Sequence, residues 1–570
     1  MPTTLLQQLF SRPLVQRSFL PLILLVGGWF AYANWFYLDD AYIAFRYAWH
    51  FAQGHGLVWY PGSQVYGYTN FLFTLLIGLL MKTGLSAEAA SSLLSLPAYL
   101  GVLILTYHMG GRWLGSHAAG VISSLALATH LTMNGYATSG LETSLQTFLI
   151  LLAYHSIFLA IEQQEDARWR WLAGAFSMAA MLVRLDSAVL LAAPLACYAL
   201  VRVHACLRKE TSWPQFLLSG VQIAALPVLG LSLMFAFCHS MYGQLLPNSF
   251  YVKVHDEWQM ANGLRYLMSF LFYQELMPFF LALLAFGFWA SAKFSMRFHL
   301  PLLVLFAAMI CWLAYLLYVG GDFMQFRFMV PLLPLMTLFL CAVIMRFARE
   351  DNRDFFALML VAFLLYGNVV QRNYFTAERS TDATGIESFD LMKSHVMAKD
   401  ISWLIAGQML GKLFYSGSAQ DVKIAVTAAG AISYGSKLPV MDMLGLNTRA
   451  VVDHAMPHMP GKPGHAIKAS FDFILHEQVH LLVGHPNFLR YHDNRYTCLP
   501  INSVMVHHDV ERPLIFIPMI NNYYLPAFYL KPHPAIEALL QSGDMLTLEE
   551  IRGKINCDFI FPPPTYKNIL

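Results

Sequence analysis

Residues Phe19–Phe36, with the sequence FLPLILLVGGWFAYANWF, form a long apolar run that is followed almost at once by an acidic pair, Asp39-Asp40. A membrane-spanning helix needs about 20 predominantly apolar residues. The run has no small-residue cleavage site of the kind that ends a secretory signal peptide. Arg12 and Arg17 precede it, and positive charge favours the cytoplasmic side. The stretch therefore predicts a first crossing from inside to outside that delivers the acidic pair to the outer surface.

The composition extends this interpretation to the whole chain of 570 residues. Hydrophobic residues make up 57% and charged residues only 12%, whereas a soluble domain carries roughly 25% charged residues. The mean hydropathy is +0.50. These values exclude an ordinary cytosolic enzyme, a disordered protein and a coiled coil, and they predict a polytopic membrane protein. The net charge of +2 gives no reason to expect nucleic acid as a partner.

The apolar runs are confined to residues 1–370, so two domains are expected. Residues 371–570 have mixed polarity with Pro and Gly punctuation, which predicts a soluble domain. Tyr68–Met81 is too short to cross and is expected to lie at the membrane interface. With Phe19–Phe36 the candidate spans number about 11, and the other ten are 87–109, 117–134, 144–161, 169–183, 187–203, 214–238, 264–290, 299–319, 328–346 and 354–370.

The least certain part of this count of spans is the pair 169–183 and 187–203. Both segments are short, and together they could form one kinked helix. With two crossings, the inner segments hold 13 Lys and Arg residues and the outer segments up to Arg372 hold 7, as the positive-inside rule requires. A single crossing would reverse every later loop. Two crossings place the C-terminal domain outside, where Cys498 and Cys557 either form a disulfide or remain a free pair.

Five outer segments carry ionisable residues right at the predicted helix ends. Taken singly, each has an ordinary explanation, such as a solvated helix end, a carboxylate at a helix N-terminus or a structural ion pair. Their coincidence at one membrane depth indicates a functional site, because such groups are costly there unless they are paired or face water. The segments are Asp39-Asp40, Gly140–Thr143 with Glu142, Arg184 to Asp186, Tyr242–Lys253, and Gly320 to Arg327 with Asp322.

This set of side chains suits transfer from a lipid-borne phosphate donor. A carboxylate can take the proton of an acceptor hydroxyl as general base, and the sequence leaves open whether Asp39 or Asp40 does so. Cations can hold the phosphate and stabilise the leaving group. Further carboxylates can bind sugar hydroxyls or recruit a divalent metal. The cations expected at the phosphate are Arg46, Lys253 and Arg327, and the carboxylates for hydroxyls or metal are Glu142, Asp186 and Asp322.

The first outer loop, residues 39–86, resembles a known family. It contains LDDAYIAFRY at Leu38–Tyr47, GHGLVWYPG at Gly54–Gly62 and VYGYTNF at Val65–Phe71. This pattern is similar to the first loop of the AftB-like arabinofuranosyltransferases of the GT-C glycosyltransferase superfamily. Trp59-Tyr60 stands where that family commonly has Tyr-Asn, and Phe71 replaces a frequent Pro. The acidic pair is intact.

Four later segments continue the resemblance in the family's order. SGLET at Ser139–Thr143 is similar throughout. LVRLD at Leu182–Asp186 resembles the family's RPD or RPE element, with Leu in place of Pro, and YGQLLPNSFY at Tyr242–Tyr251 has Gln244 where Glu is common. GGDFMQFRFMVP at Gly320–Pro331 is also similar.

The resemblance implies a GT-C fold, a first loop that bears the catalytic Asp, a polyprenyl-phosphate-linked sugar as donor and inversion at the anomeric carbon. It points to D-arabinofuranose transferred to an envelope glycan, lipid or pilin acceptor, in a bacterial inner membrane with the C-terminal domain in the periplasm. The alternative is a lipid-linked sugar transporter or flippase without transferase activity. The expected donor-binding residues are Arg46, Tyr68, Asn70, Glu142, Arg184, Asp186, Asn248, Lys253, Asp322 and Arg327, and the expected ligands of a divalent cation (Mg, Mn or Ca) are Asp40, Glu142 and Asp322.

In the C-terminal domain, Asp421–Ser436 reads as a strand, a Gly-containing turn and a helix, and Leu438–Leu446 as a second strand and turn. This pattern predicts an α/β layer, and the absence of a GxGxxG motif argues against a dinucleotide site. In relatives of the resembled family, similar segments imply packing over the active site. The letters HEQVH at His476–His480 match the HExxH metalloprotease motif. The flanking residues within 470–484 read as strands, which would not hold the two histidines at helical spacing.

Overall fold

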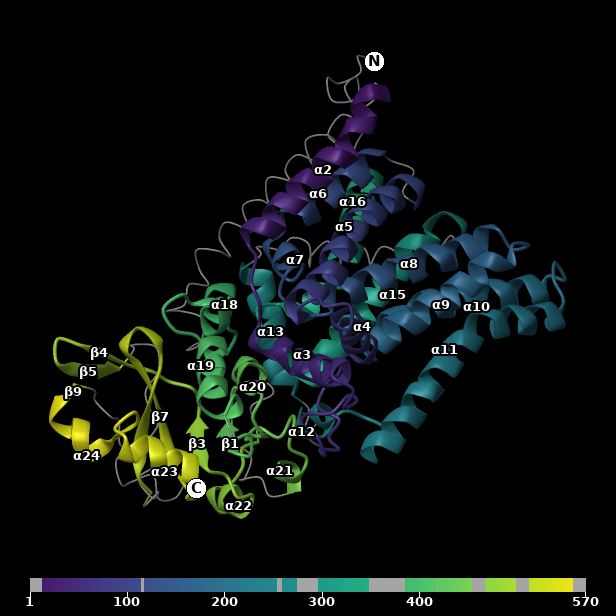
Figure 1. Ribbon diagram of the computed structural model, residues 1–570. Coiled ribbons are helices and arrows are strands. Elements are labelled where there is room, and N and C mark those ends of the chain that lie inside the picture. Colours follow the sequence, from purple (N-terminus) through teal and green to yellow (C-terminus); the bar gives the residue numbers. More distant parts are fainter. Residues whose placement is uncertain are drawn as a thin grey trace.

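The computed structural model describes residues 13–113, 117–253, 259–273, 296–347, 385–417, 419–453, 467–498 and 512–556. A helical region is joined to a smaller mixed α/β domain that packs against one end of it (Figure 1). The helical region contains α2 (Pro13–Ala33), α3 (Asp39–Ala52), α4 (Phe71–Met81), α5 (Ala87–Trp113), α6 (His117–Thr129), α7 (Leu131–Gly135), α8 (Thr143–Glu162), α9 (Ala167–Val183), α10 (Ser187–Leu207), α11 (Trp213–Tyr242), α12 (Asn248–Lys253), α13 (Met260–Tyr273), α15 (Met296–Val319), the 3-10 turn η1 (Arg327–Met329) and α16 (Leu333–Phe347).

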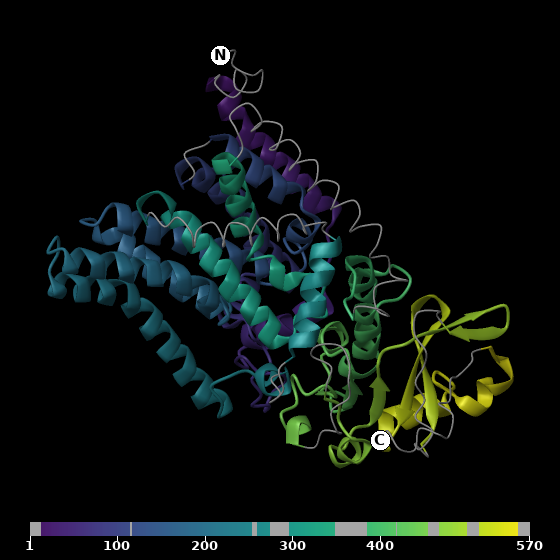
Figure 2. The same cartoon turned by 180° about the vertical axis from the view of Figure 1, so that it is seen from behind.

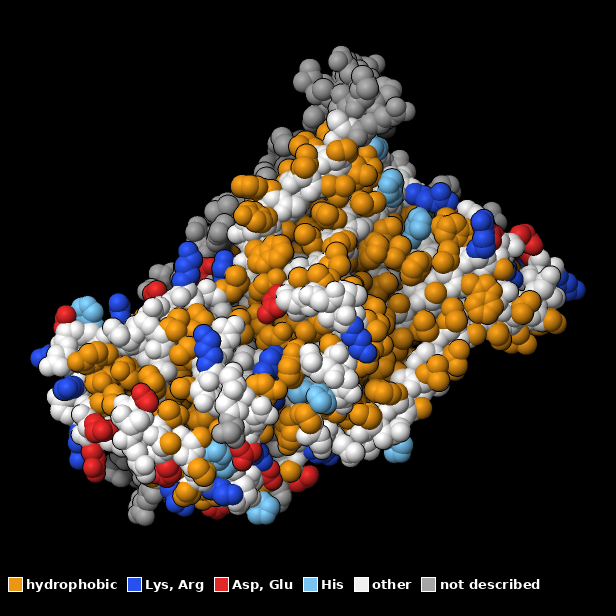
Figure 3. Space-filling view, viewed as in Figure 1, with side chains coloured by type: hydrophobic (Ala, Val, Ile, Leu, Met, Phe, Trp, Pro, Cys, Tyr) orange, Lys and Arg blue, Asp and Glu red, His pale blue; other side chains and the backbone are white. Residues whose placement is uncertain are grey.

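Hydropathy predicts most of these helices correctly. Five described helices, α5, α8, α10, α11 and the part of α15 from Leu300 to Val319, are long and apolar enough to cross a membrane. The apolar surface of the helical region contrasts with the charged surface of the C-terminal domain (Figure 3). Shorter apolar helices occur at 18–33, 117–129 and 333–342. The predicted span 354–370 and much of 264–290 lie outside the described residues.

Local sequence signals fix where the longest helix begins and ends. Ser212 starts α11 with a capping box, in which its hydroxyl accepts from the Gln215 amide and the Gln215 side chain accepts from the Ser212 amide. This arrangement satisfies two of the unpaired amides at a helix start. The helix ends at Gly243, whose φ of +68° is favourable only without a Cβ atom.

Helices α9 and α10 are two separate helices rather than one kinked helix. Arg202, near the end of α10, donates to the side chain of Gln164 in the loop before α9 at 2.7 Å. Arg170, in the first turn of α9, donates to the Gln164 carbonyl at 2.5 Å. The end of α10 therefore lies beside the start of α9, so the two helices run antiparallel. Between them, Arg184 and Asp186 lie at the opposite end of the hairpin.

The interfacial segment also agrees with expectation in length. Within Tyr68–Met81 the structure forms only α4, a helix of 11 residues. At 1.5 Å per residue it spans about 16 Å, roughly half of the hydrocarbon thickness. Helix α4 packs against α3, and both belong to the first outer loop. The rear view shows the α/β domain lying beside one end of the helical region (Figure 2).

The C-terminal domain is built on a mixed sheet in the order β2-β1-β3-β7-β4-β5-β9, with β6 paired to β7 and β8 paired to β6. Strands β2, β1 and β3 are parallel, and the pairings of β7 with β3, β4 and β6 are antiparallel. The strands are β1 (Ile424–Val426), β2 (Val440–Asp442), β3 (Leu481–Gly484), β4 (Leu489–His492), β5 (Arg495–Cys498), β6 (Leu514–Pro518), β7 (Tyr523–Tyr529), β8 (Leu546–Thr547) and β9 (Ile555–Asn556).

The helices of this domain are α18 (Phe389–Met397), α19 (Trp403–Leu410), α20 (Ala431–Ser436), α21 (Ala450–Asp453), α22 (Phe471–His476), α23 (Pro534–Gln541) and α24 (Leu548–Ile551), with a π-turn (Gly411–Tyr415) and 3-10 turns (Ile520–Asn522 and Arg552–Lys554). The predicted strand, turn and helix over 421–436 are confirmed as β1 and α20, and the second strand as β2. One prediction is wrong: the first half of 470–484 is the helix α22, not a strand. Ser470 caps this helix by accepting from the Phe473 amide, a local signal that outweighs the short apolar run.

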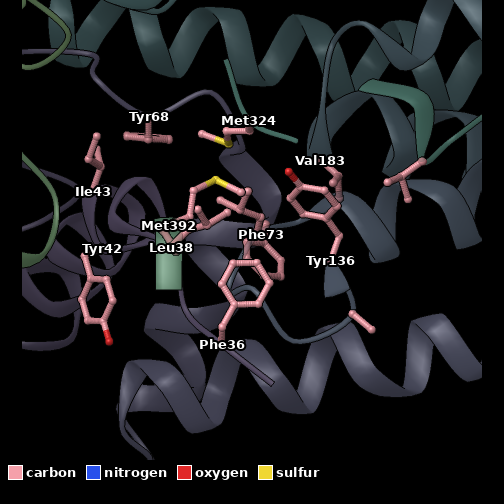
Figure 4. Packing of buried hydrophobic residues seen from close by; sticks show 14 of the residues in the cluster. Phe36, Leu38, Tyr42, Ile43, Tyr68, Phe73, Tyr136, Val183, Met324 and Met392 are labelled. Carbon is pink, nitrogen blue, oxygen red and sulfur yellow. The ribbon is translucent and has the colours of Figure 1, made fainter. Parts of the chain in front are cut away.

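One hydrophobic core continues from the helical region into the C-terminal domain. Phe36, Tyr136 and Met324 from the helical region pack with Met392 of α18 (Figure 4). The ring of Phe389, also on α18, lies with its centroid 5.1 Å from that of Phe36. The α/β domain therefore packs directly on the helical region.

Candidate functional site

A buried charge network joins three of the predicted outer segments. The Arg184 guanidinium lies between α9 and α10 and donates to Glu142 at 2.9 Å and to Asp186 at 2.5 Å. Glu142 also accepts from the side chain of Asn70, in the first outer loop, at 2.8 Å. Gln146, one turn into α8, donates to the second oxygen of Asp186 at 2.8 Å. Residues far apart in the sequence therefore meet in one polar cluster.

A second pair lies beside this network. Arg327 is 2.7 Å from Asp322, and both side chains are at most 10% exposed. The guanidiniums of Arg184 and Arg327 each lie against the Phe328 ring, 5.6 and 5.2 Å from its centroid. Although burial alone would raise the pKa of Glu142, the charges of Arg184 and Arg327 hold it below its usual value. The two pairs form one electrostatic unit.

A small pocket lies beside these charges, and in this conformation it has no room for a water molecule. It is lined by Thr143, Gln146, Arg184, Asp186, Trp312, Arg327, Phe328 and Pro331. Its walls combine two cations, hydrogen-bonding side chains and aromatic faces. The Trp312 indole donates to the Phe328 carbonyl at 2.7 Å, which fixes the aromatic wall.

The acidic pair lies where the C-terminal domain meets the first outer loop. Asp39, the first residue of α3, accepts from the backbone amides of Ala431 at 2.7 Å and Gly430 at 3.2 Å. Asp40 is close enough to Tyr136 and Asp442 for its charge to raise the pKa of each, which burial already raises. Asp40 is therefore placed at the boundary between the helical region and the C-terminal domain.

The pKa of Asp39 lies near neutral pH. Burial and the adjacent charge of Asp40 raise the pKa of Asp39 to about 7, against the lowering effect of the two amides, and Glu387 raises it further. Burial likewise raises the pKa of Asp442 to about 6.

Replacing Asp39 by Asn is expected to flatten the pH dependence of unfolding. Because the pKa of Asp39 is raised on folding, the folded protein binds more protons than the unfolded chain between about pH 4 and pH 7, so its stability falls as pH rises through this range. The wild type should lose at least about 1 kcal/mol more than the variant across this interval, since one pKa unit is worth about 1.4 kcal/mol. Denaturant titrations in detergent at both pH values measure this, with the exposed Asp390→Asn as control. Equal slopes in wild type and Asp39→Asn would contradict it.

Arg46 is placed differently from the prediction that it binds phosphate. Its guanidinium is fully buried and donates to the carbonyls of Trp59, at 2.6 Å, Ser433, and Leu438, at 2.6 Å. It also lies over the Trp59 ring. This arrangement favours a structural role, in which Arg46 joins the first loop to α20 and the start of β2.

Tyr68 and Asn248 also link segments rather than lining the pocket. The Tyr68 hydroxyl is 3.0 Å from that of Tyr242, at the end of α11. The Asn248 amide donates to the Tyr66 carbonyl at 2.7 Å, and its side chain donates to the Gly445 carbonyl at 3.0 Å. Tyr68 therefore connects the first outer loop to the end of α11, and Asn248 connects that loop to the C-terminal domain. The side chain of Lys253 lies outside the described residues, so its role stays a prediction.

The expected ligands of a divalent cation do not form a metal site. Among the described residues, no three His, Cys, Asp or Glu side chains gather as ligands. Glu142 forms an ion pair with Arg184 and accepts a hydrogen bond from Asn70, and Asp322 forms an ion pair with Arg327. These acids are already neutralised by cations and so do not fit the predicted metal set.

The HExxH segment also lacks the helical geometry of a metalloprotease site. Helix α22 ends at His476, so His480 is not on the same helical face. Glu477 binds the Lys423 ammonium at 2.9 Å, and Nδ1 of His480 accepts from the Lys423 amide at 2.9 Å. Glu477 and His480 therefore link the segment after α22 to Lys423, the residue just before β1. Cys557 lies outside the described residues, so the pairing of Cys498 with Cys557 stays open.

Three groups of site residues are absent from the sequence-based prediction. Gln146 follows Glu142 by four residues, a spacing that places both on one helix face, so it could have been found. The amides of Gly430 and Ala431 could not, because nothing local marks them as partners of Asp39. Trp312 and Phe328 read as ordinary membrane aromatics.

Comparisons with known proteins give the following. A protein family described as Domain of unknown function (DUF8728) matches residues 400–526. No curated protein matches the chain. ArnT from Cupriavidus metallidurans, bound to undecaprenyl phosphate, is similar in structure with a TM-score of 0.49 and 12% identity, over 74% of this chain and 85% of that chain. The Archaeoglobus fulgidus oligosaccharyltransferase, in complex with Zn and sulfate, has a TM-score of 0.43 and 12% identity, over 74% and 62%.

The arabinosyltransferase EmbB from Mycobacterium smegmatis has a TM-score of 0.38 and 12% identity, over 66% of this chain and 39% of that chain. The chain itself is a multi-pass membrane protein with an α/β domain after its helical region. The narrower resemblance to AftB-like enzymes stays a prediction.

Proposed function

We propose that this protein is an inverting membrane glycosyltransferase of the GT-C type that uses a polyprenyl-phosphate-linked sugar. The observation that carries the proposal is the meeting of acids and cations from separate outer helix ends beneath the C-terminal domain. Asn70, Glu142, Arg184, Asp186 and Arg327 form one network at the membrane boundary. Ionisable groups gathered at this depth mark function rather than stability alone.

Asp40 is the general base in this proposal. Both oxygens of Asp39 already accept backbone amides, which makes Asp39 the residue that fixes the start of α3. Asp40 removes the proton of the acceptor hydroxyl while the acceptor oxygen forms a bond to the anomeric carbon. The bond from that carbon to the phosphate oxygen breaks, and its electron pair leaves with the polyprenyl phosphate.

The remaining residues bind and orient. Arg327 and Arg184 stabilise the negative charge that the leaving phosphate gains, and Lys253 is a further candidate. Gln146 and Thr143, on the pocket wall, supply hydrogen bonds for sugar hydroxyls. We propose D-arabinofuranose as the sugar and an envelope glycan, lipid or pilin as acceptor, on the basis of the first-loop motif. The bacterial inner membrane with an outward C-terminal domain completes the proposal.

Asp40→Asn is expected to reduce transfer at least about 1,000-fold, because the amide cannot take up the proton. Asp39→Asn is expected to lose about 10- to 100-fold, because an amide group can replace only one of the two accepted hydrogen bonds. The assay supplies purified protein with polyprenyl-phosphoryl arabinofuranose and a panel of envelope acceptors, and follows the release of polyprenyl phosphate.

Donor binding is measured alongside turnover, so that loss of chemistry is separated from loss of binding. Full activity of Asp40→Asn would disprove its role as base. A wild type that moves the lipid-linked sugar across vesicles but forms no product would instead support the transporter alternative. Activity with another pentose only would correct the sugar and leave the reaction class intact.

A further inference from the structure

The contact between Asp39 and the C-terminal domain is unusually close. A Cβ atom placed on Gly430 would lie 1.8 Å from the Asp39 backbone oxygen, and only a residue without a side chain allows this approach. The Ala431 amide then reaches Oδ1 of Asp39 at 2.7 Å and the Gly430 amide reaches Oδ2 at 3.2 Å. The turn after β1 is thus shaped to receive this carboxylate.

Other contacts hold this turn in place. Arg46 donates from the first loop to the carbonyls of Ser433, within the helix α20 that follows this turn, and of Leu438, just after that helix. The Trp59 indole donates to the Val440 carbonyl at 2.9 Å. On the other side, Gly407 of α19 lies so close that a Cβ there would be 2.5 Å from the Ile432 carbonyl. The two amides are therefore a preorganised part of the surface that meets the acidic pair.

We propose that Gly430 and Ala431 are positioning residues of the active site, whose backbone amides orient Asp39 and, through it, the adjacent Asp40. The C-terminal domain then supplies a part of the catalytic apparatus and is not only a cover for it. Anchoring Asp39 fixes the first turn of α3, so the direction of the Asp40 side chain depends on residues about 390 positions later in the chain. This inference rests on the proposed transfer reaction.

A double-mutant cycle tests the connection. Ala431→Pro removes the amide at a position where the helix tolerates proline, since the first residue of a helix makes no intrahelical N–H bond. We expect it to lower kcat about 10- to 100-fold with KM changed less than threefold. Combined with Asp39→Asn, it should add less than about threefold to the loss caused by Asp39→Asn alone, because both changes break the same link. Ala431→Gly keeps the amide and should lose far less activity than Ala431→Pro.

Hydrogen exchange gives a readout that does not depend on activity. The amides of Gly430 and Ala431 should be protected in the wild type and should exchange at least about tenfold faster in Asp39→Asn, while the amides of β1 stay protected. Multiplicative losses in the cycle, or exchange unchanged by Asp39→Asn, would overturn the inference while the wild type remains active. An inactive wild type with normal protection would contradict the proposed reaction instead.

Discussion

Arg184→Met is expected to destabilise the protein by about 3–5 kcal/mol and to abolish transfer. The guanidinium is only 14% exposed and neutralises Glu142 and Asp186, which are 2% and 8% exposed. Its removal takes away the one guanidinium that bonds both buried carboxylates, and breaking a buried pair in this way costs about 3–5 kcal/mol. Denaturant titration in detergent measures the stability loss, and the transfer assay measures the second effect.

The matched control is Arg112→Met, which removes an ion pair with Glu162 whose side chains are 46% and 47% exposed. An exposed pair contributes only about 0–1 kcal/mol, so this variant should stay within that range. Adding Glu142→Gln and Asp186→Asn to Arg184→Met should restore most of the stability without restoring transfer. Similar losses for Arg184→Met and Arg112→Met would contradict the view that the network is buried and coupled.

Arg46→Met is expected to release the C-terminal domain from the first outer loop. Methionine keeps much of the side-chain volume, but the carbonyls of Trp59, Ser433 and Leu438 lose their shared donor. Each unsatisfied buried group costs about 1–3 kcal/mol, so the summed loss is about 3 kcal/mol or more. Limited proteolysis should cut between the two domains at least about tenfold faster than in the wild type.

Arg490→Met provides the control for this variant, because Arg490 is exposed and lies over the Tyr523 ring within the C-terminal domain. It should leave the rate of interdomain cleavage unchanged. A phosphate-binding role for Arg46 predicts a different pattern, with weaker donor binding and unchanged proteolysis. The two measurements together therefore decide between the structural role and the role expected from the sequence.

Hydropathy and charge predict much of the helical region. The break at Arg184 to Asp186 is visible because two ionisable residues interrupt an apolar run, and the antiparallel hairpin of α9 and α10 follows from the positive-inside count. Boundaries are less well predicted. The expected span 117–134 divides into α6 and α7 at His130, because hydropathy does not register a local turn.

The site was predictable in part, because ionisable residues at helix ends stand out from apolar surroundings. Glu142, Arg184 and Asp186 do come together, as their shared depth suggested. The role of Arg46 was not predictable, since its Ser433 and Leu438 partners are backbone carbonyls that carry no sequence signature. The partners of Asp39 were not predictable for the same reason, since they are the backbone amides of Gly430 and Ala431.

The long-range contact between Arg46 and the α20 region has a consequence for biogenesis. Ribosomes deliver the N-terminal part of a chain first, so Arg46 is synthesised while Ser433 and Leu438 are still hundreds of residues away. Until that later segment is made, the guanidinium lacks these two acceptors and α3 lacks its anchor. The packing of the first loop against the C-terminal domain can therefore be completed only late in synthesis.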